Sequence, residues 1–332
     1  MAIRIPPCPR FLTGDQEWKR PWNLWLQVAF YSSSLPLMRV HTLDLQFQNT
    51  PGLIAAYLVE SGHELALIET GPGSTLPTLR KAMLAKGFQP GDVRHVFVTH
   101  IHLDHAGAAG WWAQQGSQVY CHPSAARHLV DPSRLMDSAR RVYAERMDTL
   151  WGEMLPAPEE RVTALADNES IRVGEVQFTA WDTPGHARHH HAFVVGDACF
   201  TGDVAGLRLA GSPYLSVTAA PPQFDPPAYV ASVDRLLAAN FQRLFLTHFG
   251  EVTDVKDHLS RYRQRIEEVH QNVRTWIQQG CTPAEIEKRY SETEHALAIA
   301  AGLSPADWQL HQMSNATGMC ADGVRLYVEK NP

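Results

Sequence analysis

The spacing of apolar and polar positions changes several times from Met38 onward, and each spacing predicts one kind of element. Short apolar runs bounded by turn residues predict strands at 53–60, 64–70 and 93–100. Between the last two, glycine, serine and threonine precede an apolar segment that ends at a glycine, which predicts a capped helix. Further apolar segments predict strands at 117–123 and 241–250, strands joined by turns within 171–203, and a helix at 227–240. This order predicts an α/β (α+β) domain with functional side chains at strand ends.

Three regions lie outside this alternation. Residues 1–37 are rich in Pro and Trp and show no period, so we expect an N-terminal extension. Residues 133–155 have the 3.6-residue spacing of one amphipathic helix, with Val142 and Met147 on its apolar face. From about residue 253 onward the chain reads as helical. We therefore expect an extension at 1–37, a main domain at 38–252 with a helical insert at about 131–157, and a C-terminal helical region at 253–332.

Composition narrows the classes of function. The net charge of −6 provides no basic field, so nucleic acid is not an expected partner. No apolar run is long enough for a transmembrane helix, so we expect no membrane association. The 5 cysteines lack the paired spacing of a zinc ribbon or redox motif, which indicates a reduced, cytoplasmic protein. The 17 histidines are the main clue, because those in the middle of the chain cluster in a few motifs.

One short stretch carries most of the chemical information. The sequence VTHIHLDHAG ends a predicted strand and contains His100, His102, Asp104 and His105. Building a hydrophobic core requires nothing of this kind. Imidazole nitrogens and carboxylate oxygens are the ligands that zinc and similar divalent ions take in proteins. The stretch therefore predicts a metal site in the loop that follows the strand.

Three later stretches also place a metal-competent side chain directly after a strand end or turn. DTPGH ends in His186, TGD ends in Asp203 and FLTH ends in His248. One ion with an open coordination position needs three or four protein ligands, so these residues and the earlier four suit two ions that share a carboxylate. Such a pair of ions can hold a bridging hydroxide and polarise a carbonyl or phosphoryl oxygen. The ligand set therefore predicts hydrolysis.

In this order the four stretches resemble the metallo-β-lactamase superfamily, and the resemblance covers about residues 38–252. It implies a four-layer αββα sandwich with the metal site at one edge of two facing sheets. It also implies that one ion is held by His100, His102 and His186, the other by Asp104, His105 and His248, with Asp203 as the bridge. The segment LIETGPG is similar to one where relatives usually read LIDTG, so Glu69 is a longer carboxylate at a position that orients ligands.

Within the superfamily the chain looks most like the glyoxalase II-like hydrolases, which include members with a helical insert and a helical tail. It differs from glyoxalase II itself, which has a Cys-Gly-Lys/Arg segment after its aspartate, because this chain reads GDVAGLRLAGSPY there. Homoserine lactonases are also similar, but they carry a tyrosine three residues after the bridging aspartate, where this chain has Gly206. Neither substrate is favoured over the other.

The expected function is a dinuclear metal-dependent hydrolase that cleaves an acyl bond in a small-molecule thioester, ester or lactone. A metal-bridging hydroxide would attack, with Asp104 or water assisting proton transfer. Zinc is the expected metal, and the ligands also suit iron or manganese. Two other classes stay open. The first is a persulfide dioxygenase-like enzyme with one iron, but such an enzyme would leave the second group of ligands unused. The second is a non-catalytic member of the fold, but such members have often lost ligands, and this chain retains all of them.

Other side chains have a structural interpretation. Because a strand alternates its faces, at most two of His189, His190 and His191 point toward the site, and His190 is the one expected to support it. His122 and His128 are expected to be structural. The apolar stripe of the C-terminal helices is expected to cover the sandwich or a second subunit of a homodimer. The insert offers side chains for packing or for the wall of an acyl pocket, namely Leu135, Met136, Tyr143, Met147, Trp151 and Met154.

Overall fold

The computed structural model describes residues 38–332, so the extension expected at 1–37 lies outside the described residues. The strands of the described part form two six-stranded sheets. In order across the first sheet these are β1 (Met38–Asp44), β2 (Ala55–Ser61), β3 (Glu64–Ile68), β4 (Val93–Phe97), β5 (Gln118–Cys121) and β6 (Val162–Ala164). In order across the second they are β12 (Gly250–Val252), β11 (Arg243–Leu246), β10 (Ala198–Gly202), β9 (His191–Val195), β8 (Val176–Asp182) and β7 (Ser170–Val173).

Both sheets mix parallel and antiparallel pairs. In the first sheet, β1, β2 and β3 are antiparallel neighbours, whereas β3 to β6 are parallel. In the second sheet, β10 and β11 are parallel and the other pairs are antiparallel. Each of the strands β4, β10 and β11 is followed within three residues by a predicted ligand, namely His100, Asp203 and His248. Ligands of α/β sheets commonly bind at the carboxyl ends of strands, and the strand directions here allow this arrangement.

Aromatic side chains fill the space between the sheets. Phe97 of the first sheet stacks on Phe178 of the second with ring centroids 4.5 Å apart, and it meets Phe193 edge-on at 5.1 Å. Tyr57 packs in the same way against Phe245, at 5.3 Å. All five side chains are buried, and offset or edge-on pairs of this kind add to the free energy gained by burying their area. This shared core holds the two sheets face to face.

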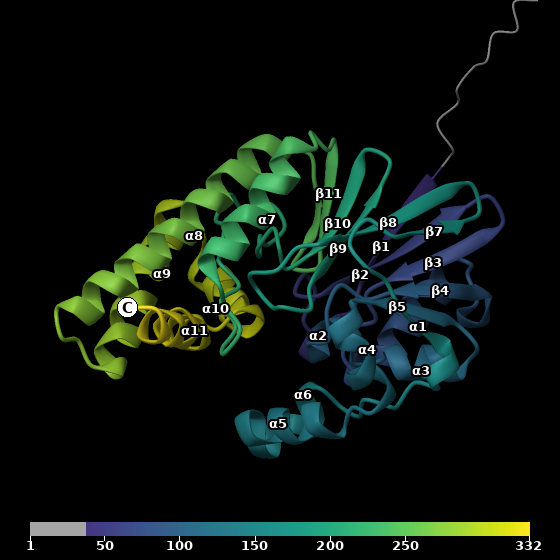
Figure 1. Cartoon of the computed structure of the whole chain (residues 1–332), viewed down its shortest axis with the longest axis horizontal. Coiled ribbons are helices and arrows are strands. Elements are labelled where there is room, and N and C mark those ends of the chain that lie inside the picture. The colour runs from purple at the N-terminus through teal and green to yellow at the C-terminus, as the bar shows by residue number, and fades with distance from the viewer. Residues whose placement is uncertain (1–37) are drawn as a thin grey trace, which may run out of the picture. The chain divides into compact units, whose positions relative to one another are not determined.

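Helices cover the outer face of each sheet (Figure 1). On the first sheet, α1 (Leu76–Ala85), α3 (Ala109–Gln114) and α4 (Pro123–Val130) bury apolar side chains in one cluster. On the second sheet, α7 (Pro226–Ala238) and α8 (Val255–Gln278) do the same in another cluster. The layers are therefore helix, sheet, sheet and helix, which confirms the predicted four-layer αββα sandwich.

The C-terminal region continues from α8 into α9 (Pro283–Ala300), α10 (Pro305–Ser314) and α11 (Thr317–Lys330). Two of these helices begin with a capping box. At α9, the Thr282 hydroxyl accepts a hydrogen bond from the backbone N–H of Glu285, whose carboxylate accepts one from Thr282 N at 2.8 Å. Ser304 and Asp307 make the equivalent pair at α10. The expected helical C-terminal extension is thus present, and its apolar stripe packs with α7 and α8.

The predicted continuous helix at 133–155 is wrong. The chain instead forms α5 (Ser133–Tyr143), a short 3-10 turn and α6 (Met147–Leu150). The break falls at Ala144, whose φ of 47° is incompatible with an α-helix. Just before the break, Val142, expected on the apolar face, is 67% exposed, whereas Met147 and Leu150 beyond it are buried. The apolar pattern predicted the helix but carried no sign of the turn inside it.

No helix within residues 38–332 combines the length and the apolar character needed to cross a membrane.

Candidate metal centre

The structure brings the seven predicted ligands together at one edge of the sandwich. His100 lies in the loop after β4, and the short helix α2 (Leu103–Ala106) carries the next two ligands of that motif after His102. His186 lies in the loop between β8 and β9, while Asp203 directly follows β10. Gly202 makes this close approach feasible, because a Cβ at its position would lie 2.4 Å from the hydroxyl of Thr99. Loops from both sheets therefore supply the site.

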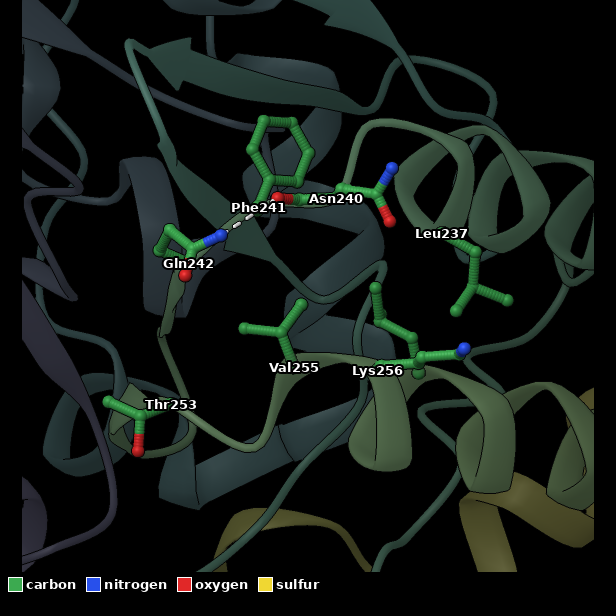
Figure 2. A pocket seen from close by; sticks show the side chains of 8 residues that line it. Leu237, Asn240, Phe241, Gln242, Thr253, Val255 and Lys256 are labelled. Atoms are coloured by element: carbon green, nitrogen blue, oxygen red, sulfur yellow. Dashed lines mark hydrogen bonds between the residues drawn. The ribbon is translucent and has the colours of Figure 1, made fainter. Parts of the chain in front are cut away.

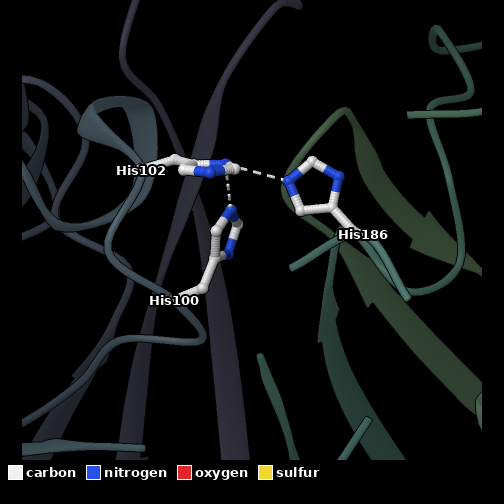
Figure 3. A group of neighbouring side chains, drawn as sticks. All are labelled: His100, His102 and His186. Carbon is white, nitrogen blue, oxygen red and sulfur yellow. Dashed lines mark hydrogen bonds between the residues drawn. The ribbon is translucent and has the colours of Figure 1, made fainter. Parts of the chain in front are cut away.

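Three imidazoles form the first group (Figure 3). Nε2 of His100 lies 3.0 Å from Nδ1 of His102, and Nε2 of His186 lies 2.9 Å from the same atom. A single proton on His102 Nδ1 can be donated to only one of these neighbours. Three nitrogens that converge in this way are well suited to sharing a cation, since their lone pairs face one point.

A carboxylate and two imidazoles form the second group. Oδ2 of Asp104 lies 3.3 Å from Nε2 of His248 and 3.5 Å from Nε2 of His105. These three ligand atoms lie within 4.8 Å of one another. This is a mixed nitrogen and oxygen set, which borderline divalent ions accept.

Asp203 stands between the two groups. Its Oδ2 lies 3.3 Å from Nε2 of His186 in the first group. Its Oδ1 lies 3.3 Å from Nε2 of His105 and 3.5 Å from Nε2 of His248 in the second group. Each oxygen of one carboxylate thus faces a different group of ligands.

Backbone carbonyls fix the protonation of two ligands. Nδ1 of His186 donates to the carbonyl of Thr218 at 2.7 Å, and Nδ1 of His248 donates to the carbonyl of Leu53 at 2.8 Å. Because a carbonyl can only accept, the ring proton lies on Nδ1 and the lone pair of Nε2 is free to face the site. Ser314, at the end of α10, also lies 3.2 Å from Nδ1 of His248, so the C-terminal region reaches the site.

Glu69 fixes the protonation of two more ligands. Its carboxylate is 1% exposed and accepts from Nδ1 of His105 at 3.0 Å and from the hydroxyl of Thr99 at 2.5 Å. The Thr99 oxygen therefore accepts from Nδ1 of His100, at 3.0 Å. In both imidazoles the Nε2 lone pair is left for the site. Glu69 occupies the position expected from the sequence, and its contacts identify it as the residue that orients His105.

His190 supports the site from behind, as the sequence predicted. Its Nε2 accepts a hydrogen bond from the backbone N–H of Asp203 at 3.1 Å, and its Nδ1 lies 2.8 Å from the hydroxyl of Thr183. The carbonyl of Asp203 is held on its other side by the hydroxyls of Thr218 and Tyr229, at 3.2 and 2.5 Å. No motif marks Thr218 or Tyr229, because they reach Asp203 only through the tertiary fold.

Charge in the second group favours a cation. Burial lowers the pKa of His105, but the carboxylates of Asp104, Glu69 and Asp203 outweigh it and raise this pKa well above its ordinary value. The pKa of Asp203 moves the other way, because the imidazoles around it outweigh its burial and hold it well below the usual range. The carboxylates of Asp104 and Asp203, whose pKa values are both lowered, are therefore ionised and attract positive charge, as a proton or as a metal ion, to this point.

Buried atoms without partners provide a further test of whether metal ions fit. Nε2 of His105 and Oδ1 of Asp203 are both buried, and neither makes a hydrogen bond of acceptable geometry. Buried polar atoms in native proteins nearly always have a partner, so such atoms call for an explanation. The atoms face one another within a group of candidate ligands, and a divalent ion would satisfy both. The donor set thus fits the expected ions.

The insert contributes packing and one wall of this region. Met136, Met147 and Met154 are buried in the cluster beneath the first sheet, so they pack as core and do not line an acyl pocket. Tyr143 and Trp151 are partly buried, with ring centroids 5.1 Å apart. Burial, and after it the nearby charge of Asp104, raises the pKa of Tyr143 to about 12. A neutral phenol of the insert therefore lies in the electrostatic range of the candidate ligands.

A separate hollow of about 240 Å³ lies between the end of α7, the segment that follows it and the start of α8 (Figure 2). Its lining contains no imidazole, carboxylate or thiol, so it has no part in the metal centre. The residues that line it are Leu237, Asn240, Phe241, Gln242, Thr253, Val255, Lys256 and Leu259.

Known proteins share this architecture. The chain is 27% identical over 245 residues to the metallo-beta-lactamase fold-containing protein ST1585 of Sulfurisphaera tokodaii, covering 72% of this chain and 89% of that protein. The crystal structure of the archaeal superfamily protein ST1585 from Sulfolobus tokodaii matches with a TM-score of 0.57 at 23% identity, over 69% of this chain and 86% of that one. The metallo-beta-lactamase family protein TTHA1429 from Thermus thermophilus matches with a TM-score of 0.60 at 19% identity, over 90% and 94% of the two chains.

The sequence model of one family, described as the Metallo-beta-lactamase superfamily, matches residues 49–248. This match spans more than half of the chain and contains all seven candidate ligands. The two structural likenesses, both below 25% identity, show the same fold. The chain therefore belongs to the metallo-β-lactamase superfamily.

Proposed function

We propose that the chain is a dinuclear metal-dependent hydrolase of acyl bonds, similar to the glyoxalase II-like group, with a thioester, ester or lactone as its small-molecule substrate. The observation that carries the proposal is the position of Asp203, whose two carboxylate oxygens face different groups of ligands. Members of the superfamily are typically metal-dependent hydrolases, which supports the reaction class.

The proposed sites follow the two groups of ligands. His100, His102 and His186 would hold one divalent ion, and Asp104, His105 and His248 would hold the other, with Asp203 shared between them. Zinc suits these ligands, and iron or manganese would also be accepted. When bound, such ions polarise a carbonyl oxygen and lower the pKa of water, which is the chemistry that hydrolysis requires.

The substrate and the proton acceptor, Asp104, would meet on one side of the site. Of the seven ligands only His102 and Asp104 are partly exposed, so the substrate would approach from their side. Asp104 is ionised, because His105 and His248 outweigh its burial and hold its pKa below the usual range. Its carboxylate would orient the attacking water and accept its hydrogen bond. The outer hydrogen bonds of the imidazoles would keep this arrangement rigid during the reaction.

Charge and side-chain character support an acyl substrate over a phosphodiester. The net charge of −6 disfavours polyanions, and Tyr143 of the insert lies within the electrostatic range of Asp104. Arg140 lies on the insert, where its guanidinium pairs with exposed Asp148 at 3.3 Å. This pair is solvated, so Arg140 would still be free to meet an anionic leaving group.

The test begins with elemental analysis of the protein purified without added metal. We expect close to two transition-metal ions per chain, and loss of metal and of activity in His102→Ala and Asp203→Ala. His128→Ala is the matched control, because His128 is a partly exposed histidine of the same domain outside the ligand groups. Full activity in either ligand variant would refute the assignment of the site.

The substrate class is tested separately, at equal metal loading. The values of kcat/KM for a thioester and lactone series are compared with that for a bis-aryl phosphate. We expect the acyl substrates to be favoured. A ratio below one would replace the acyl assignment by phosphodiester hydrolysis, while leaving the metal assignment unaffected.

A further inference from the structure

A second cluster of metal-competent side chains lies outside the seven candidate ligands. His122, Asp182 and His191 each offer one ligand atom, and these atoms lie within 4.8 Å of one another. We propose that these three residues form a separate binding site for a divalent transition-metal ion, with zinc as the preferred ion, that links the two sheets.

The backbone brings the three residues together from both sheets. Asp182 and His191 are directly opposite each other in the antiparallel pair of β8 and β9, in the second sheet. His122 directly follows β5 of the first sheet and is the N-cap of α4. An ion held by all three would therefore connect the second sheet to the first.

Unpartnered buried atoms point to a ligand at this position. The side chain of His191 is fully buried, and neither Nδ1 nor Nε2 makes a hydrogen bond. Oδ1 of Asp182 is also a buried atom without a hydrogen bond, although the rest of this side chain is partly exposed. Burying an imidazole with both nitrogens unsatisfied carries a large desolvation cost. An ion bound between these atoms would remove that cost.

The geometry of the cluster suits a tetrahedral ion. Nε2 of His122 lies 3.4 Å from Oδ1 of Asp182. Ligands about 2.0–2.1 Å from a tetrahedral zinc are themselves about 3.3–3.4 Å apart. The rings of His122 and His191 are tilted toward each other, with centroids 4.7 Å apart. In the structure Nδ1 of His122 accepts the cap hydrogen bond from the backbone N–H of Ser124 at 3.1 Å. An ion on Nε2 would move the ring proton to Nδ1, which would then donate to the hydroxyl of Ser124, 2.7 Å away, in place of accepting the cap bond. Three protein ligands leave the fourth position for water.

Neighbouring charges are compatible with a cation. The cluster contains one carboxylate, that of Asp182, beside the two imidazoles. Arg235 is the nearest positive group, but its guanidinium donates to the carboxylate of Asp167 at 2.7 Å and to the backbone carbonyl of Asp182 at 3.1 Å. Asp167 therefore compensates Arg235, and the carboxylate of Asp182 remains to attract the ion.

This site would stiffen the loop that carries a ligand of the main centre. His191 directly follows His190, whose ring accepts the hydrogen bond from the backbone N–H of Asp203. The backbone N–H of His191 donates to the carbonyl of Thr99 at 2.8 Å. The loop from Asp182 to His191 includes His186. An ion that holds both ends of this loop would restrict its motion from outside the main centre.

The experiment compares zinc binding by intact chains. Wild type, Asp182→Asn and His122→Asn are stripped with a chelator, loaded with excess zinc, dialysed and measured by elemental analysis. Asparagine at 122 retains a side chain that can cap α4, so this variant keeps the helix start. Glu175→Gln is the matched control, because it changes an exposed carboxylate directly before β8 that lies outside the proposed site. We expect each ligand variant to hold about one zinc fewer per chain than wild type and the control.

Thermal unfolding provides a second measurement that does not depend on activity. An ion bound only to the folded chain raises Tm, so zinc should raise the Tm of wild type more than that of Asp182→Asn. Equal zinc content and an equal Tm response in wild type and both ligand variants would overturn the proposal, leaving the cluster as a hydrogen-bonded link between the sheets. Because every comparison is made against wild type, the result is independent of how many ions the main centre holds.

Discussion

Replacing Glu69 by glutamine tests how the outer contacts of the candidate metal centre act. The four contacts of this carboxylate are all with donors: the ring of His105, the hydroxyl and backbone N–H of Thr99, and the hydroxyl of Thr247. A glutamine amide has one oxygen to accept and an NH₂ group that can only donate. Whichever way the amide lies, at least one donor of Thr99 or His105 faces another donor.

The expected size of the effect follows from the bond to His105. A hydrogen bond to a charged group contributes about 1.5–3 kcal/mol, and the 1% exposure of Glu69 means that water does not replace it. If His105 loses its acceptor, its ring proton is free to move to Nε2, where it would block the lone pair that faces the centre. We therefore expect the ion of the second group to bind about 10–100-fold more weakly, the range typical for loss of such outer partners. The ion of the first group should be affected less.

The assay is a zinc titration of the stripped protein against a competing chelator, which resolves the two binding steps. Glu60→Gln is the matched control, because Glu60 lies on the neighbouring strand β2 and makes only a 3.5 Å contact with His41. Circular dichroism and Tm establish that each variant is folded before the affinities are compared. If Glu69→Gln is folded and both affinities equal those of wild type, Glu69 does not control the protonation of His105.

Three further predictions concern stability. Gly323→Ala should lower the free energy of unfolding by about 1–3 kcal/mol, because the added Cβ would lie 1.9 Å from the backbone oxygen of Ala219. Gly318→Ala, in the same helix, is the control, because its Cβ would meet only the flexible side chain of Glu287. Urea denaturation measures the stability of both variants. Burial lowers the pKa of His311 to about 4, so between pH 6.5 and 4 the unfolded chain binds a proton that the folded chain does not. Stability should therefore fall by about 2 kcal/mol from pH 7 to pH 5 through this residue, and denaturation of His311→Phe at both values should show a smaller fall; an unchanged fall would contradict this origin. Deleting residues 1–37 should leave a folded protein that still binds metal, since the regular pattern begins at β1; an insoluble truncated chain would show that the extension belongs to the core.

Local pattern was sufficient for most of the elements. The strands β3 and β4 lie within the apolar runs that predicted them, and β2 extends one residue beyond its run, because short runs between turn residues have few alternatives to a buried strand. The helices α9 and α10 begin where threonine or serine precedes an acidic residue by three positions, so the local sequence specifies the capping box at each start. Short edge strands such as β6 and β12, with three residues each, had no such signal. They form because a neighbouring strand offers hydrogen bonds to them.

The sequence also indicated which residues form the candidate metal centre. The motif around His100 is dense enough in ligand types to be recognised alone, and His186, Asp203 and His248 each follow a predicted strand end or turn. Which of these candidate ligands lie together in one group depends on distances, however, and these come only from the folded chain. There the two oxygens of Asp203 lie 3.3 Å from His186 on one side and from His105 on the other.

The tertiary structure alone decided which residues far apart in the chain contact each other. The bond from Glu69 to His105 spans 36 positions, and the meeting of His122 with Asp182 joins two different sheets. The break at Ala144 could not be predicted from the pattern either, since the apolar spacing runs through it. Periodicity reports the face that a segment buries. It carries no information about which distant side chain will meet that face, because this depends on how all the layers pack together.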